Sequence, residues 1–142
     1  AGAPWKTQYW ARETMDRMYM ATPDGYCGDE DNGQTSAWYV FSAMGFYPVA
    51  PATDQYVLGA PLFKKLTLKL ENGKELVINA PENSDENRYI ESMKVDGKTY
   101  NKNWLSHQAI MDGMTIDYDM SETPNKSRGT KKSAYPYSLS NE

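Results

Sequence analysis

Residues 28–44 read GDEDNGQTSAWYVFSAM, which places three adjacent acids in a glycine-flanked turn directly before an apolar run. The run from 35 to 44 contains no glycine, proline or charged residue, and Gly45 follows it as a stop signal. This pattern predicts a helix over 35–44, with Thr35 or Asp31 as its N-cap. Because the helix is apolar on almost every side, we expect other helices to enclose it.

The three acids, Asp29, Glu30 and Asp31, have a structural and a catalytic interpretation. Acids before a helix N-terminus gain about 0.3–1 kcal/mol each from the helix dipole, although one acid would suffice for capping. Alternatively, Asp29 and Asp31 flank Glu30, so an extended turn would point both carboxylates to one side. The helix N-terminus would keep them ionised, as a general base requires. A calcium loop is excluded, because Gly33 and Val40 stand where that motif needs ligands.

A first helix is predicted over residues 8–20, where neither glycine nor proline interrupts the chain. Its apolar residues are Tyr9, Trp10, Met15, Met18 and Tyr19, and its expected solvent-exposed face consists of Arg12, Glu13, Asp16 and Arg17. The segment from Thr22 to Gly25 has the composition of a turn. Two helices cannot enclose so much apolar surface, and leaving it wet costs several kcal/mol at about 25 cal/mol per Å². We therefore expect the chain to be a piece of a larger protein.

Beyond the helices the hydrophobic period changes from that of a helix to two, which is typical of strands. One hairpin is expected over 66–79 around an Asn-Gly turn, a second over 89–100 around Asp-Gly, and a further strand over 114–120. The chain after residue 121 is polar and is expected to be extended or disordered. Helices followed by strands predict an α+β fold, divided into helices at 1–52, a β-sheet segment at 53–122 and a polar C-terminal tail at 123–142.

The composition excludes several classes of function. The net charge is -4 and the pI is near 5.0, so nucleic acid is not an expected partner. The sequence has neither an apolar run of the roughly 18 residues that span a membrane nor a visible signal peptide. One cysteine, Cys27, forms no internal disulfide or cysteine metal cage, and the sole histidine, His107, is expected to be structural. The basic run at 126–132 is interpreted as a solvated end.

Residues 22–48 closely resemble a signature of glycoside hydrolase family 92, the bacterial exo-acting, calcium-dependent α-mannosidases. The similarity continues through 54–63, 70–74, 84–89 and 124–125. It implies an enzyme several times longer than this chain, with an N-terminal β-sandwich and an (α/α)6 catalytic barrel. By this resemblance the chain is a C-terminal fragment: two or three helices from the end of the barrel, followed by a C-terminal β-rich segment.

The resemblance also implies a mechanism, the inverting hydrolysis of terminal α-linked mannose from glycans. Asp31 is expected to be the general base and Asp29 to help hold the water, although the two roles could be reversed. Glu30 is expected to point away, and Gln34 to orient a carboxylate or contact the sugar. The resemblance implies calcium as cofactor. The general acid and the main calcium ligands are expected upstream of residue 1, so no metal ligand is assigned within this chain.

Further expectations concern the fragment as a protein in its own right. Alone it is expected to be inactive, to lack its partners, the N-terminal β-sandwich and the rest of the barrel, and to self-associate through exposed helix faces. A periplasmic or secreted location follows from the family's role in glycan degradation. The alternative function is a non-catalytic carbohydrate-binding or structural β module, whose aromatic candidates are Trp104, Tyr89, Tyr100 and Tyr118.

Overall fold

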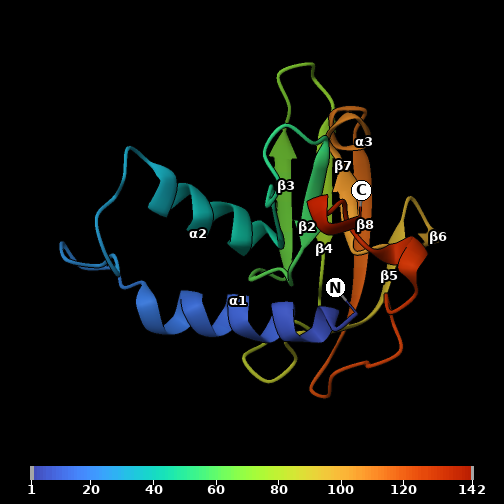
Figure 1. Ribbon diagram of the computed structural model, residues 1–142, viewed down its shortest axis with the longest axis horizontal. Coiled ribbons are helices and arrows are strands. Elements are labelled where there is room, and N and C mark those ends of the chain that lie inside the picture. Colours follow the sequence, from blue (N-terminus) through green and yellow to red (C-terminus); the bar gives the residue numbers. More distant parts are fainter. Residues whose placement is uncertain (1, 142) are drawn as a thin grey trace.

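The computed structural model describes residues 2–141. Two long helices pack against two β-sheets (Figure 1). The helices are α1 (Pro4–Met18), α2 (Gln34–Met44) and the short α3 (His107–Met111), with 3-10 turns η1 (Lys132–Ala134) and η2 (Leu139–Asn141). A three-stranded sheet has the order β1 (Phe46–Tyr47), β2 (Gln55–Leu58), β7 (Trp104–Ser106). A five-stranded sheet has the order β3 (Lys65–Lys69), β4 (Glu75–Asn79), β8 (Met114–Ser121), β5 (Tyr89–Val95), β6 (Lys98–Thr99). The α+β class is confirmed.

The larger sheet is built on the two expected hairpins. Strands β3 and β4 pair antiparallel across the Asn-Gly turn, with Leu66 opposite Ile78, and β5 pairs with β6 across Asp-Gly. Strand β8 lies between the hairpins, parallel to β4 and antiparallel to β5. This parallel pairing and the smaller sheet were not predicted, because β1 and β7 are too short to show a period of two.

The hydrophobic core belongs mainly to the β region. Leu76, Ile78 and Ile116 have exposed fractions of 0%, and they pack in one cluster with Phe46 and Leu58 of the smaller sheet. Alternate residues of β4 and β8 point to the same face of the sheet, which explains why their alternating sequences bury a continuous apolar layer.

Helix α1 packs against the β region with a face that the sequence predicts to be exposed to solvent. Arg12 is only 2% exposed, and its Nη2 donates to the Pro61 carbonyl at 2.8 Å and to Asn83 Oδ1 at 3.0 Å. Glu13 is partly buried and bonds Arg88 at 2.7 Å. The prediction of a solvent-exposed face was therefore wrong for Arg12 and Glu13. The Pro61 and Ser84 carbonyls and Asn83 Oδ1 accept from the two terminal nitrogens of the guanidinium, which an apolar interface could not do, while Arg12 Nε has no partner in the described part of the chain.

The C-terminal segment packs against the sheets rather than extending into solvent. Arg128 is 7% exposed, and its guanidinium donates to the carbonyls of Tyr100 at 3.2 Å and Lys102 at 3.3 Å, and to Asn103 Oδ1 at 3.3 Å. The interpretation of this basic run as a solvated end was wrong at Arg128, because hydrogen bonds with distant segments cannot be read from local composition.

Helix α2 ends where the sequence predicts. Gly45 adopts the left-handed conformation with φ 99°, and its N–H donates to the carbonyls of Phe41 and Ser42. A Cβ at this position would also lie 2.9 Å from the Pro61 nitrogen, so glycine is required twice over. Among the described residues, no helix combines the length and apolarity needed to cross a membrane.

Candidate active site

The acidic turn lies at the end of the two long helices that is farthest from the sheet (Figure 1). It follows the expected turn at Thr22–Gly25, in which the Gly25 N–H donates to the Thr22 carbonyl at 3.0 Å and the Met20 N–H to the Gly25 carbonyl at 2.9 Å. A Cβ on Gly25 would overlap the Met20 carbonyl oxygen. This tight loop returns the chain so that the acids reach the N-terminus of α2.

The backbone of the acidic turn is left-handed over three consecutive residues. Asp31 has φ 54°, Asn32 has φ 57° and Gly33 has φ 94°. The expectation of an extended turn that points two carboxylates to one side was therefore wrong at Asp31. Gly33 is the N-cap of α2 and makes no side-chain capping bond, so neither Asp31 nor Thr35 is the N-cap. Asp and Asn tolerate the left-handed region better than other non-glycine residues, which lets this sequence adopt the turn.

Glu30 is the acid that is bonded to the helix. Its Oε1 accepts the Ser36 N–H at 3.1 Å and the Ser36 hydroxyl at 2.6 Å. These bonds, the hydroxyl first and the amide second, lower the pKa of the Glu30 carboxyl below its ordinary value. Glu30 Oε2 is buried and has no hydrogen-bond partner in the described part of the chain. The carboxylate thus does the capping that the N-cap residue itself does not.

Asp29 and Asp31, the two predicted catalytic residues, stay exposed on either side of Glu30. Neither carboxylate forms a hydrogen bond or an ion pair with the described residues. Asp29 contributes only its carbonyl, which accepts the Thr35 hydroxyl at 2.9 Å. Gln34, the predicted substrate-binding residue, is also exposed, at the first position of α2. The turn therefore presents two unengaged carboxylates and one amide beside a third carboxylate that is fixed.

An aromatic cluster, which the sequence did not predict, packs between the end of α1 and the first turns of α2, next to the acidic turn. The Tyr19 ring stacks on Trp38 with centroids 5.6 Å apart and planes at 12°, and it contacts Tyr39 at 5.0 Å. The Tyr19 hydroxyl donates to the Thr35 carbonyl at 3.1 Å. Burial raises the pKa of Tyr19, with a smaller effect from Cys27. These contacts join the end of α1 to the first turn of α2. The spacing of the rings in the sequence gives no signal of them.

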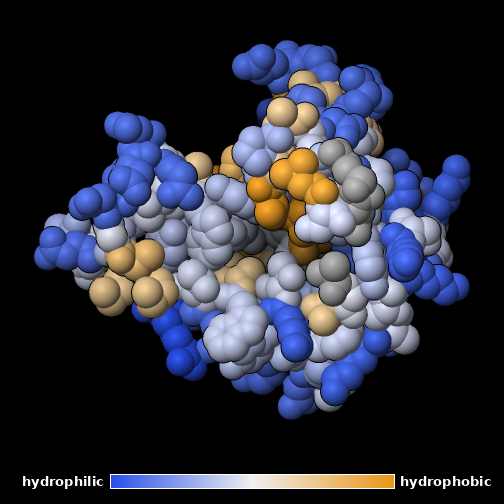
Figure 2. All heavy atoms as spheres, viewed as in Figure 1, coloured by the Kyte–Doolittle hydropathy of each residue, from blue (hydrophilic) through white to orange (hydrophobic). Residues whose placement is uncertain are grey.

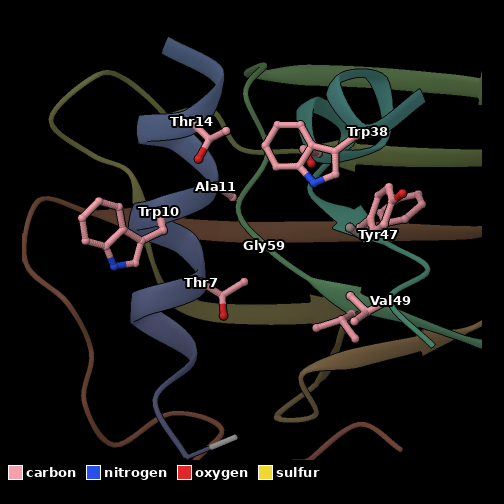
Figure 3. A pocket seen from close by; sticks show the side chains of 11 residues that line it. Thr7, Trp10, Ala11, Thr14, Trp38, Tyr47, Val49 and Gly59 are labelled. Carbon is pink, nitrogen blue, oxygen red and sulfur yellow. The ribbon is translucent and has the colours of Figure 1, made fainter. Parts of the chain in front are cut away.

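An apolar groove of about 260 Å³ lies between α1, α2 and the smaller sheet. Trp10 of α1 stands on one side, and Trp38, Tyr47 and Val49 stand on the other (Figure 3). Trp10 is 63% exposed and Val49 is 61% exposed. Figure 2 shows the most hydrophobic side chains gathered in the middle of this face, whereas the far end of the helices has both hydrophilic and moderately hydrophobic side chains. The helical half thus has an apolar groove and an acidic turn, and both are open to solvent.

The remaining chemically active side chains are dispersed. His107 lies at the start of α3, where its Nδ1 is 3.0 Å from the Tyr56 hydroxyl, and Cys27 is exposed. Across residues 2–141, no three acidic, histidine or cysteine side chains are placed to hold a metal ion together. The acidic turn is therefore the best candidate site in this part of the chain.

Comparison with known proteins points to one family of glycoside hydrolases. The sequence model of the glycosyl hydrolase family 92 catalytic domain matches residues 1–122. A protein of Arthroderma benhamiae named as a secreted glycosidase is 28% identical in an alignment of length 142 that covers 98% of this chain and 18% of that protein.

Two solved structures are similar to the chain in both fold and sequence. A family GH92 inverting mannosidase from Bacteroides thetaiotaomicron has a TM-score of 0.92 at 50% identity, covering 98% of this chain and 19% of that enzyme. A family GH92 α-mannosidase from the same organism has a TM-score of 0.91 at 41% identity, covering 96% of this chain and 18% of that enzyme. The chain spans less than a fifth of the length of these relatives. On the match to its catalytic-domain model, the chain belongs to glycosyl hydrolase family 92.

Proposed function

We propose that this chain is the C-terminal part of an inverting exo-α-mannosidase that hydrolyses terminal α-linked mannose from glycans. In this role 1–52 would supply the last helices of an (α/α)6 barrel, and the β region would close the domain. The observation that carries the proposal is the acidic turn, where Asp29 and Asp31 are exposed and unengaged while the neighbouring Glu30 is anchored. A merely structural acidic turn would not need the two free carboxylates.

Inversion at the anomeric carbon needs two carboxyl groups on opposite faces of the sugar. One protonates the leaving oxygen, and the other accepts a proton from the attacking water; they lie roughly 6.5–9.5 Å apart. Asp31 is proposed as the base, with Asp29 holding the water, or the reverse, because the exposed carboxylates can accept hydrogen bonds from water. Gln34 would orient one of these carboxylates or contact the sugar, and the general acid would come from outside this chain.

Calcium is proposed as the cofactor of the longer protein, where it would bind sugar hydroxyls. The described residues do not fit a complete calcium site, because no three acidic or other metal-binding side chains converge. The main ligands would therefore be supplied by the rest of the protein, and none of the roles assigned to this chain's residues depends on the metal.

The apolar groove is proposed to dock the preceding part of the same barrel. The chain covers 19% of the length of its mannosidase relative, so most of such a protein lies outside it. Covering Trp10 and Val49 would bury two large apolar side chains that are more than 60% exposed in this chain. Without that cover the chain alone would be inactive and would self-associate. A periplasmic or secreted location is proposed from the family resemblance, and the name of the fungal relative supports the secreted alternative.

The alternative of a carbohydrate-binding β module has little support in the structure. Tyr118 is 3% exposed, and the Tyr100 hydroxyl donates to the Trp104 carbonyl at 2.6 Å. Lys102 Nζ lies 4.3 Å from the centroid of the Trp104 ring. Tyr118 is in the core, Tyr100 is bonded to the backbone and Lys102 lies over the Trp104 ring, so these three side chains do not form a flat exposed surface on which a sugar ring could stack.

The test is to follow the anomeric form of the product by NMR during hydrolysis of a synthetic α-mannoside by the full-length protein. The proposal predicts β-mannose as the first product, and no turnover by the 142-residue chain alone. Initial release of α-mannose would refute inversion. Turnover by the isolated chain would refute the assignment of the general acid to another part of the protein.

A further inference from the structure

Glu30 has a role in the acidic turn that the sequence did not predict. Both its backbone and its side chain are bonded to the first turn of α2, which is compatible with the expectation that it points away from the site. Its carbonyl accepts the Thr35 N–H at 3.1 Å, and its Oε1 accepts the N–H and the hydroxyl of Ser36 at 3.1 and 2.6 Å. The residue immediately before Asp31 is therefore fixed at two points.

The segment that follows Glu30 needs such fixing. Asp31, Asn32 and Gly33 are all left-handed, a conformation that costs energy at the two non-glycine positions. In the described part of the chain, a weak bond from the Gln34 N–H to the Asp31 carbonyl, 3.3 Å long, is the only backbone hydrogen bond that closes the turn across these three residues without involving Glu30. Because Gly33 has no capping side chain, the carboxylate of Glu30 occupies the place where an N-cap oxygen would bond the helix.

Ser36 makes the connection specific. Its hydroxyl donates to Glu30 Oε1 and lies 3.3 Å from the Gly33 carbonyl, so one side chain contacts both sides of the left-handed segment. An acceptor oxygen at position 30 can use both donors of Ser36 at once. Charge strengthens these bonds, but the geometry requires only an oxygen that accepts.

We propose that Glu30, through Ser36, is a positioning residue that sets the direction of the Asp31 carboxylate relative to the helix N-terminus. It bonds the backbone donor and hydroxyl that begin α2, and it does not itself touch the substrate. This inference rests on the proposed function, in which Asp31 activates the attacking water. If Asp31 were displaced, the site would still bind the sugar, but the attacking water would be held in the wrong place.

The test compares Glu30→Ala, Glu30→Gln and Ser36→Ala in the full-length protein, with kcat and KM measured on an α-mannoside. Glu30→Ala removes the acceptor and is expected to lower kcat about 10–100-fold, the range for misplacement of a catalytic group by about 1 Å, with KM nearly unchanged. Glu30→Gln keeps an oxygen that accepts both Ser36 donors, and it is expected to restore most of that loss. Ser36→Ala keeps only the amide donor and is expected to fall between them.

A double variant and two reference variants complete the test. Glu30→Ala combined with Ser36→Ala is expected to be little worse than Glu30→Ala alone, because both changes remove the same contact. Glu71→Ala, at an exposed acid in the distant hairpin turn, is expected to keep wild-type kcat. Asp31→Asn reports on the proposed function itself and is expected to lower kcat by about 10²–10⁴-fold.

Each outcome decides the inference. Recovery of kcat in Glu30→Gln supports positioning. An equal, near-complete loss in Glu30→Ala and Glu30→Gln would show that the charge takes part in catalysis and would overturn it, as would wild-type kcat in Glu30→Ala. Full activity of Asp31→Asn would overturn the proposed role of Asp31 and remove the basis of the inference, whatever the Glu30 variants do.

Discussion

The β region and the helical region differ in how much of their apolar surface they enclose. Leu76, Ile78 and Ile116 of the sheet are fully buried, whereas Trp10 and Val40 of the helices are 63% and 55% exposed. Both regions have strongly apolar segments, so composition does not explain the difference. The β region buries most of its apolar side chains in one core. The helical region packs polar side chains such as Gln8 and Arg12 against the β region, while Trp10 and Val40 are exposed to solvent. The open region is also the one that has the acidic turn, which agrees with the proposal that this region docks the rest of a longer protein.

The largest effect on stability is expected from Ile116→Ala in the centre of β8. Truncation of a fully buried isoleucine costs about 2–5 kcal/mol, because the lost contacts leave a cavity. Val40→Ala, on the exposed side of α2, is the matched control and is expected to change the free energy of unfolding by less than about 0.5 kcal/mol. Denaturant unfolding of the 142-residue chain measures both. Equal losses for the two variants would contradict the contrast between the regions.

Arg12→Met is expected to have the next largest effect, because it removes one of the buried links between the regions. The Pro61 carbonyl and Asn83 Oδ1 would lose a donor, and each unsatisfied buried acceptor costs about 1–3 kcal/mol. Hydrogen exchange should show weaker protection in α1 than in the sheet. Arg17→Met, at an exposed position on the same helix, is the control. Unchanged protection of α1 in Arg12→Met would mean that other contacts hold the helix.

A smaller effect, dependent on pH, is expected from Glu30. Its pKa in the folded chain lies below the ordinary value of 4.5, so its stabilising contribution is present above that value. The contribution is lost as the pH falls through the pKa of the folded state. Wild type should therefore be more stable than Glu30→Gln at pH 7, and this advantage should shrink in acid well below 4.5. An advantage that grows on acidification would contradict the bonds to Ser36.

The smallest effect on stability, but a visible one on assembly, is expected from Trp10→Gln. This change reduces the exposed apolar surface at the groove without removing a buried contact. Size-exclusion chromatography of the isolated chain should show less self-association than wild type. A wild-type chain that elutes as a monomer at all concentrations would argue that the groove does not need to be covered.

Local patterns predicted the elements of this fold better than their orientation. The Asn-Gly and Asp-Gly turns located both hairpins, and Gly45 located the end of α2, because each depends on a few neighbouring residues. The orientation of α1 could not be predicted, since the Arg12 guanidinium donates hydrogen bonds to carbonyls that lie 49 residues and more along the chain. The parallel pairing of β4 with β8 depends in the same way on distant segments.

The candidate site was also only partly predictable. The three acids are evident in the sequence, but which one bonds the helix depends on the left-handed backbone from Asp31 to Gly33. The sequence favoured Glu30 as the acid that points away, but it gave no signal that Glu30 is bonded to Ser36. The support that Tyr19 gives to Trp38 and Thr35 joins two segments across a loop, and no periodic pattern reports it.

The central claim is that a free aspartate beside an anchored glutamate activates water, and kcat of Asp31→Asn in the full-length protein tests it most directly. The substitution keeps the size of the side chain but removes the proton acceptor. We expect kcat to fall by about 10²–10⁴-fold, with the fold and KM largely preserved. Asp29→Asn, measured in parallel, decides which of the two is the base. Undiminished turnover in both variants would contradict the account.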